Sequence, residues 1–157
     1  FDSKEALYGE IVAASLSELS RAVRRAVADA DGGAARVRAG PRAFHDFYRD
    51  NPVDLELSLY LVQGLRPTGL TSELNRLLNG RLIAVLQVIA DAILKAGAPS
   101  REEANTEAVA AVTHMCGVLL LDKTGRLGTF GFAGDGLADR YLDTLVARLP
   151  RAQGGDK

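Results

Sequence analysis

The stretch TSELNRLLNGRLIAVLQVIADAILKAG, residues 71 to 97, decides the fold class. Its apolar residues recur at steps of three and four, the spacing of one face of an α-helix, at Leu74, Leu78, Leu82, Val85, Ile89 and Ile93. Thr71 is a suitable N-cap residue, and Gly97 stands where a left-handed glycine commonly ends a helix. We therefore predict a long and strongly apolar helix from about Thr71 to Ala96.

The composition of the whole chain favours the same fold class. The 157 residues are 47% hydrophobic but only 6% aromatic, they include no Trp, and Ala and Leu dominate. Ala and Leu are strong helix formers, whereas a sheet would be rich in Val, Ile, Thr and aromatic residues. A chain of this length should bury roughly 70% of its unfolded surface. We predict one all-α domain of about six helices.

Five further helices follow from the same periodicity. We expect them over residues 3–30, 34–49, 52–63, 100–121 and 137–149. The first would be on the order of 40 Å long, and Asp2 or Ser3 would cap it together with Glu5. Ser100 and Glu103 have the spacing of a capping box for the fifth helix in chain order.

Three local features of this prediction stay open or irregular. Pro41 is either a kink inside the second helix or its true first turn. The glycine-rich residues 125–136 read as a flexible connection between the last two helices, although a local β-hairpin over residues 118–130 is a possible exception to the all-α prediction. Residues 150–157 are expected to form a disordered tail.

Charge and cysteine content exclude several classes of protein. A net charge of −1 and a pI near 6.2 provide no basic surface for nucleic acid within these residues. One Cys rules out an internal disulfide and a site with several Cys ligands. No signal peptide is visible, and the longest apolar runs fall short of the ~20 residues that span a bilayer. We expect a cytoplasmic protein with no membrane association and no cofactor.

The apparent catalytic motifs have simpler interpretations. Asp122-Lys123-Thr124-Gly125 begins like the phosphorylated-aspartate motif of P-type ATPases, but no alternation of strands and helices surrounds it, so we interpret it as a turn after a helix. The glycines after it lack the GxGxxG spacing of a phosphate loop. His45, His114 and Cys116 are too few for a zinc site without carboxylates that the sequence cannot place. We predict no catalytic residue and no metal site.

The first residues, FDSKEALY, resemble the junction of TetR-type transcriptional regulators, where an aromatic residue, a short polar pair and Lys-Glu-x-Leu precede a long helix. Phe1, Ser3, Lys4, Glu5 and Leu7 match that junction. The aromatic-rich FHDFYRDNP, residues 44–52, and the short helix after it are similar to the elements that follow in the family. The resemblance extends to about Leu149, but the three-helix DNA-binding domain has no counterpart within residues 1–157.

The resemblance implies a division of the chain and a mechanism. Residues 1–2 would be the remnant of the junction with the DNA-binding domain, and residues 3–149 the ligand-binding and dimerisation domain of a regulator, most often a repressor. A small apolar or amphipathic effector would act through the first helix on a helix-turn-helix domain bound to operator DNA. Lys4 would lie near the DNA backbone, although a solvated lysine explains it equally well.

Candidate sites follow from the helical stripes. Ligand pockets in bundles are lined by apolar and aromatic side chains with a few polar groups, so the candidate ligand-binding residues are Phe44, Phe47, Tyr48, Tyr60, Leu78, Leu82, Val85, His114 and Met115. The family dimerises through its last two long helices, which suggests an interface of Val112, Leu119, Ala138, Tyr141, Leu142, Leu145 and Leu149.

Two alternatives to the regulator remain at this point. The chain could be a self-contained helical carrier or enzyme domain unrelated to transcription, or a scaffold that only dimerises. Neither the effector nor the operator sequence can be identified from these residues.

Overall fold

The structure is a computed structural model that describes residues 4–59 and 71–150. All regular secondary structure in these two ranges is helical, as predicted. The helices are α1 (Lys4–Asp29), α2 (Gly33–Asp50), α3 (Pro52–Ser58), α4 (Ser72–Lys95), α5 (Arg101–Lys123), α6 (Arg126–Thr129) and α7 (Gly134–Ala147).

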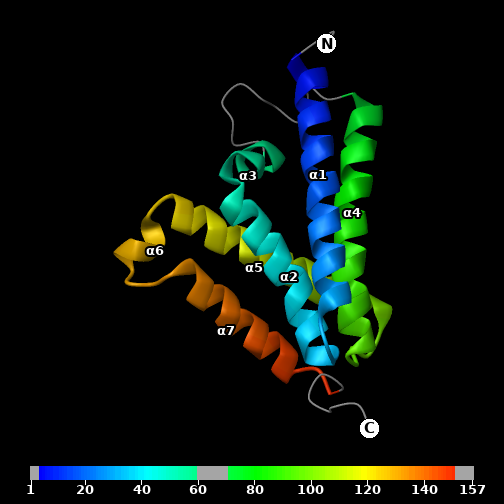
Figure 1. Cartoon of the computed structure of the whole chain (residues 1–157), viewed down its shortest axis with the longest axis vertical. Coiled ribbons are helices and arrows are strands. Elements are labelled where there is room, and N and C mark those ends of the chain that lie inside the picture. The colour runs from blue at the N-terminus through cyan, green and yellow to red at the C-terminus, as the bar shows by residue number, and fades with distance from the viewer. Residues whose placement is uncertain (1–3, 60–70, 151–157) are drawn as a thin grey trace.

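The helices form a bundle with an attached hairpin (Figure 1). α1 and α4 lie side by side along the long axis, and α2 packs across both of them. α5 packs against α2 and α4, then extends away from the α1–α4 pair and is followed by α6. α7 returns antiparallel to α5 and contacts both α5 and α2.

α2 approaches α4 closely because Gly40 has no side chain. A Cβ at Gly40 would lie 2.9 Å from Cγ1 of Ile89 and 3.4 Å from Cγ2 of Val27. Pro41 follows directly and is buried inside α2, so it stands in the interior of the helix and not in its first turn. Gly40 and Pro41 therefore mark the crossing of α2 with α1 and α4.

Three predicted helix ends, at Thr71, Gly97 and Ser100, are confirmed. The Thr71 hydroxyl accepts from the backbone N–H of Leu74 at 3.2 Å, and the Ser100 hydroxyl accepts from that of Glu103 at 3.1 Å. Gly97 has a φ of 106°. Its N–H donates to Leu94, and the N–H of Ala98 donates to Ile93, which is the double hydrogen bond of a Schellman motif.

The possible hairpin over residues 118–130 is wrong. α5 continues to Lys123, and α6 begins after Gly125, which has a φ of 71°. The apolar run 118–121 therefore belongs to the last turns of α5, where Val118 and Leu119 are buried. A short run of this kind cannot be told from a strand by periodicity alone.

Some predicted features lie outside the described residues or end earlier than expected. α3 ends at Ser58, before the predicted position 63, and residues 60–70 are not described. The predicted N-cap at Asp2 or Ser3 and the predicted tail beyond Pro150 also lie outside the described ranges.

Two helices, α4 and α5, are long and apolar enough to cross a membrane by length and composition alone. The core helices of soluble proteins pass the same test. Here both helices supply the centre of the bundle, through Val85, Ile89 and Ile93 of α4 and Ala108, Ala111 and Met115 of α5.

The glycines of α4 and its C-terminus provide a stability test. Replacing Gly97 with Ala should lower the free energy of unfolding by about 1 kcal/mol, because a Cβ disfavours a left-handed φ. Gly80 is the matched control, since nothing lies within 4 Å of its Cβ position. Gly80→Ala should raise the free energy by about 0.5 kcal/mol through helix propensity. Urea unfolding measures both changes in the free energy of unfolding. The prediction requires a decrease for Gly97→Ala and an increase for Gly80→Ala.

Candidate functional site

An apolar cavity of about 190 Å³ lies among the first five helices. α1 contributes three side chains at successive helical turns, and α2 contributes two aromatic rings. The lining consists of Tyr8, Val12 and Leu16 of α1, Phe44 and Tyr48 of α2, Leu55, Ser58 and Leu59 of α3 and its end, Leu78, Asn79 and Leu82 of α4, and Val112 and Cys116 of α5. This cavity is the candidate functional site.

Two tyrosines provide hydroxyl groups at the cavity wall, and both are anchored to α3. The Tyr8 hydroxyl donates to the carbonyl of Leu57 at 2.7 Å, and the Tyr48 hydroxyl donates to the Ser58 hydroxyl at 3.1 Å. Burial raises the pKa of Tyr48 to about 12, so this phenol stays protonated at neutral pH. Hydrogen bonding therefore fixes α3 against α1 and α2 with neutral groups.

The aromatic side of the cavity is built by neighbouring residues of α2. The rings of Phe44 and Tyr48 meet edge to face with centroids 4.9 Å apart. Phe47 also contacts Tyr48 edge to face, at 5.3 Å. Edge-to-face packing orients each ring, so the shape of this wall is set within α2.

Cys116 lines the cavity as a neutral thiol. Burial raises the pKa of Cys116 to about 11, so the thiolate that would act as a nucleophile or metal ligand is scarce at neutral pH.

The cavity reaches the surface beside α4. Among its described lining residues, Asn79 and Leu82 are exposed, and Leu82 is 37% exposed. The aromatic residues of α2 at the opposite side are almost fully buried. A ligand would therefore enter near Asn79 and Leu82 and approach the rings of α2.

The structure brings four of the predicted ligand-binding residues to the cavity: Phe44, Tyr48, Leu78 and Leu82. Val85 and Met115 are fully buried and Phe47 packs against the core, but these three do not line the cavity. Tyr60 lies outside the described residues.

His114, a predicted ligand-binding residue, does not line this cavity. Its ring stacks on Tyr141 with centroids 4.3 Å apart, and its Nε2 lies 3.4 Å from the carbonyl oxygen of Leu137. Both partners belong to α7. His114 therefore joins α5 to α7 on the side of α5 away from the cavity.

Sequence reasoning missed the contribution of α1. Tyr8, Val12 and Leu16 recur at steps of four along the predicted first helix. This spacing carries no signal for where packing leaves a gap. Ser58 and Asn79 were missed because polar residues on predicted helices usually face solvent.

Most residues of the predicted dimer interface are buried within the single chain. Leu119, Ala138, Leu142, Leu145 and Leu149 are each at most 5% exposed within the single chain. Val112 lines the cavity, and Tyr141 is half-buried against His114. An apolar stripe shows that a helix face is buried, but not whether the partner is the same chain or another.

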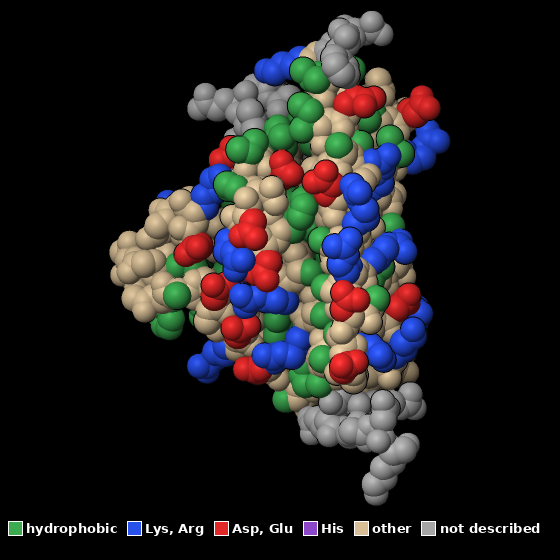
Figure 2. Space-filling model, viewed as in Figure 1, with side chains coloured by type: hydrophobic (Ala, Val, Ile, Leu, Met, Phe, Trp, Pro, Cys, Tyr) green, Lys and Arg blue, Asp and Glu red, His purple; other side chains and the backbone are tan. Residues whose placement is uncertain are grey.

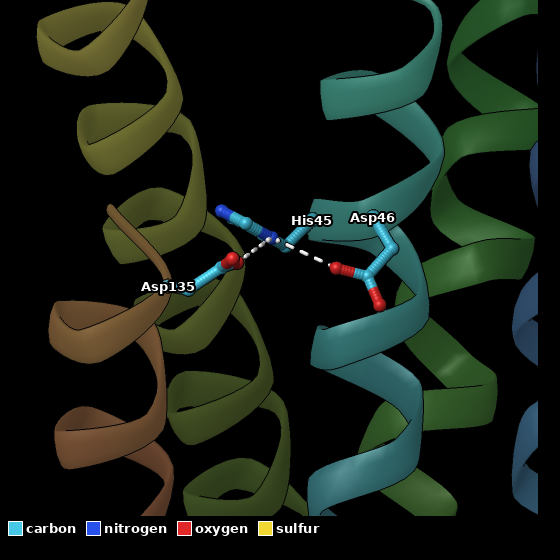
Figure 3. Close-up of side chains that lie close together, drawn as sticks. All are labelled: His45, Asp46 and Asp135. Carbon is cyan, nitrogen blue, oxygen red and sulfur yellow. Dashed lines mark hydrogen bonds and ion pairs between the residues drawn. The ribbon is translucent and has the colours of Figure 1, made fainter. Parts of the chain in front are cut away.

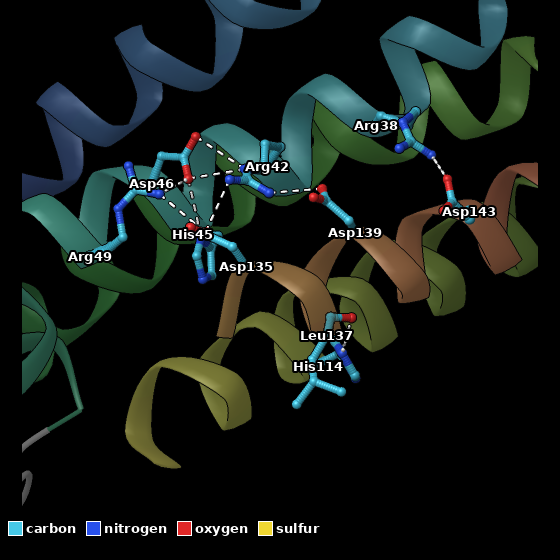
Figure 4. A network of polar contacts seen from close by, with 10 residues as sticks. All are labelled: Arg38, Arg42, His45, Asp46, Arg49, His114, Asp135, Leu137, Asp139 and Asp143. Carbon is cyan, nitrogen blue, oxygen red and sulfur yellow. Dashed lines mark hydrogen bonds and ion pairs between the residues drawn. The ribbon is translucent and has the colours of Figure 1, made fainter. Parts of the chain in front are cut away.

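The face of α2 that does not line the cavity carries a row of ion pairs to α7, called the ladder below (Figure 4). Arg42 contacts Asp139 at 2.8 Å, Asp135 at 3.0 Å and Asp46 at 3.1 Å. Burial alone lowers the pKa of Arg42, but the hydrogen bond to Asp46 and the three carboxylate charges raise it overall. Arg42 is therefore the centre of the contact between α2 and α7.

The ladder continues in both directions along α2. Arg38 pairs with Asp143 on one side, and Arg49 lies 3.2 Å from Asp135 on the other. Figure 2 shows acidic and basic side chains interleaved over α2 and α7. This face thus has mixed charge and does not form a patch of one sign.

His45, Asp46 and Asp135 come close enough to suggest a metal site (Figure 3). Nδ1 of His45 is 3.1 Å from Oδ1 of Asp46 and 3.9 Å from Oδ1 of Asp135. Arg42 and Arg49 contact the same carboxylates at 3.0 to 3.2 Å, so a cation would have to displace both guanidinium groups. We assign the cluster to the contact between α2 and α7.

Comparison with known proteins leaves the family open. No family model and no curated protein matches the chain. A solved structure of a protein with unknown function from Rhodococcus sp. RHA1 is similar, with a TM-score of 0.73 and 22% sequence identity. The match covers 98% of this chain and 75% of that chain. The two proteins therefore share a fold.

Replacing Arg42 tests the ladder. Arg42→Gln should lower the free energy of unfolding by about 1 kcal/mol at low ionic strength and by less in high salt, because salt screens partly exposed charges. Arg25→Gln, on the exposed side of α1, should change it by less than about 0.5 kcal/mol. Urea unfolding at two salt concentrations measures both. A loss for Arg42 that is independent of salt would instead indicate packing of its aliphatic stem.

Proposed function

We propose that this chain is the ligand-binding and dimerisation domain of a TetR-like regulator that responds to a small molecule, most often as a repressor. The observation that carries the proposal is the position of Tyr8, Val12 and Leu16. These residues of α1 form one wall of the cavity, so whatever fills the cavity acts directly on α1.

α1 has the length to transmit a change over a large distance. Its 26 residues span about 39 Å at 1.5 Å per residue, and it packs against both α2 and α4. A ligand that repacks the cavity would shift or tilt this helix and so change the spacing of two DNA-reading domains in a dimer.

The proposal assigns DNA binding to residues outside this chain. A net charge of −1 supplies no general attraction to phosphate. Lys4 is exposed in the first turn of α1, which suits the proposed contact with the DNA backbone. The site of action would be the cytoplasm.

The proposed dimer uses the outward face of α5, in place of the inward stripe. This face comprises Val109, Ala110, Thr113, Gly117 and Leu121, of which Val109 is 50% exposed and Leu121 38% exposed. Residues 108–121 contain no Asp, Glu, Lys or Arg. Depletion of charge is typical of the core of an interface, and a two-fold axis would place this face against its own copy.

A self-contained carrier would share the same cavity, so the coding sequence before Phe1 is the observation that separates the two functions. The regulator requires a helix-turn-helix segment of roughly fifty residues there. A start codon directly before Phe1 would contradict it.

Oligomeric state tests the dimer face. Gly117→Arg should raise the dimer dissociation constant at least about 100-fold, because each copy would bring an unpaired charge to the buried face. The monomer should be unaffected, since nothing lies within 4 Å of the Cβ position of Gly117. Gly80→Arg, at an equally open glycine of α4, is the matched control.

Light scattering over a range of concentrations measures this equilibrium, and circular dichroism checks that both variants fold. A wild-type chain that stays monomeric at high micromolar concentration would refute the dimer. Equal dissociation constants for Gly117→Arg and Gly80→Arg would refute this choice of face.

A further inference from the structure

We propose that the cavity selects a neutral, compact ligand with an apolar body and one hydrogen-bond acceptor. This acceptor would accept a hydrogen bond from one of the paired hydroxyls of Tyr48 and Ser58. The inference rests on the proposed function for the existence of a ligand and adds its chemical class. It depends on three observations: the number of hydroxyl protons, the charges around the cavity, and its volume.

The paired hydroxyls leave one proton without an acceptor. Tyr48 and Ser58 each carry one O–H, and a single hydrogen bond of 3.1 Å joins them. Whichever group donates in that bond, the other retains a proton for which the described residues provide no further hydrogen bond. Both residues line the cavity. A ligand oxygen in the cavity could accept a hydrogen bond from this remaining O–H.

The other polar groups of the cavity are less suited to donate a hydrogen bond to such a ligand. The Tyr8 hydroxyl already donates to the carbonyl of Leu57 at 2.7 Å, and the Cys116 thiol is a weak donor. Asn79 lies at the exposed mouth of the cavity. The pair on α2 and α3 is therefore the position where a ligand would be oriented.

The charges around the cavity disfavour an anion. No Asp, Glu, Lys, Arg or His is among the described lining residues. The carboxylate of Asp54 lies near this wall: its Oδ2 accepts from the Ser15 hydroxyl at 2.8 Å, and its charge acts on the Tyr48 hydroxyl. A carboxylate ligand would bring a second negative charge beside this one with no lining cation to offset it.

The cavity volume limits the ligand to a small molecule. An engineered apolar cavity of about 150 Å³ holds benzene, and this cavity has about 190 Å³. A single ring with a short substituent therefore fits, and the substituent can bear the acceptor oxygen.

Three probes of the same size and shape test the class: cumene, acetophenone and benzoate. Each is a benzene ring with a branched substituent of the same number of heavy atoms, which is apolar in cumene, a neutral acceptor in acetophenone and anionic in benzoate. Calorimetric titration of the full chain should show binding of acetophenone and at least tenfold weaker binding of benzoate.

Removing both hydroxyls tests the proton donor. In the double variant Tyr48→Phe with Ser58→Ala, the affinity of acetophenone relative to cumene should fall about 3- to 10-fold, the range of one neutral hydrogen bond. Each single variant should retain most of the preference, because one hydroxyl proton remains in either. Ser20→Ala, on α1 outside the cavity lining, should leave the ratio unchanged.

A cavity-filling variant locates the binding site. Val112→Phe should abolish binding of both cumene and acetophenone, and circular dichroism should show that the helical fold is kept. If that variant is unfolded, Leu82→Phe, at the exposed mouth of the cavity, serves in its place.

Several results would overturn the inference. These are the absence of binding by any probe, benzoate binding as tightly as acetophenone, or an unchanged ratio in the double variant. A chain that dimerises but binds no neutral probe would refute this inference without refuting the dimer. A monomeric chain that binds acetophenone as described would refute the regulator and keep the ligand class.

Discussion

The close approach of α2 to α1 and α4 at Gly40 is the contact on which the rest of the structure depends. The space that a Cβ would take at this position is filled by Ile89 and Val27. With α2 seated there, Phe44 and Tyr48 face the cavity, while Arg42 and Arg49 face α7. One helix thus separates an apolar ligand site from a charged contact between helices.

The two sides of α2 are stabilised by different kinds of interaction. The cavity side is held by ring packing and by hydrogen bonds between neutral groups, which salt does not screen. The α7 side is held by several partly exposed ion pairs around Arg42, which are individually weak and act as a network. The contact between α2 and α7 therefore varies in strength with ionic conditions, whereas the cavity wall does not.

The functional proposal joins these features through α1. A helix that lines the cavity with Tyr8, Val12 and Leu16 and packs against α2 and α4 can carry a change in packing toward its first turn. The outward face of α5 is exposed, whereas core residues of the same helix such as Met115 are buried.

Much of the secondary structure could be predicted because its causes are local. The spacing of Leu78, Val85 and Ile89 makes α4 a helix, and Thr71, Ser100 and Gly97 act through backbone groups within a few residues. The apolar stripes also identified Phe44, Tyr48, Leu78 and Leu82, since aromatic and aliphatic residues of a bundle lie in its interior.

The cavity, the ladder and the free faces were decided by tertiary packing. Arg42 meets Asp135 and Asp139 across 93 and 97 positions of the chain, and no local pattern pairs charges over that distance. The stripe of α7 was real, yet it was covered by the same chain and was not available to a second one. The periodicity of apolar residues predicts which side chains are buried, because it depends on the geometry of one helix. Which atoms contact a buried side chain depends on how all the helices pack together.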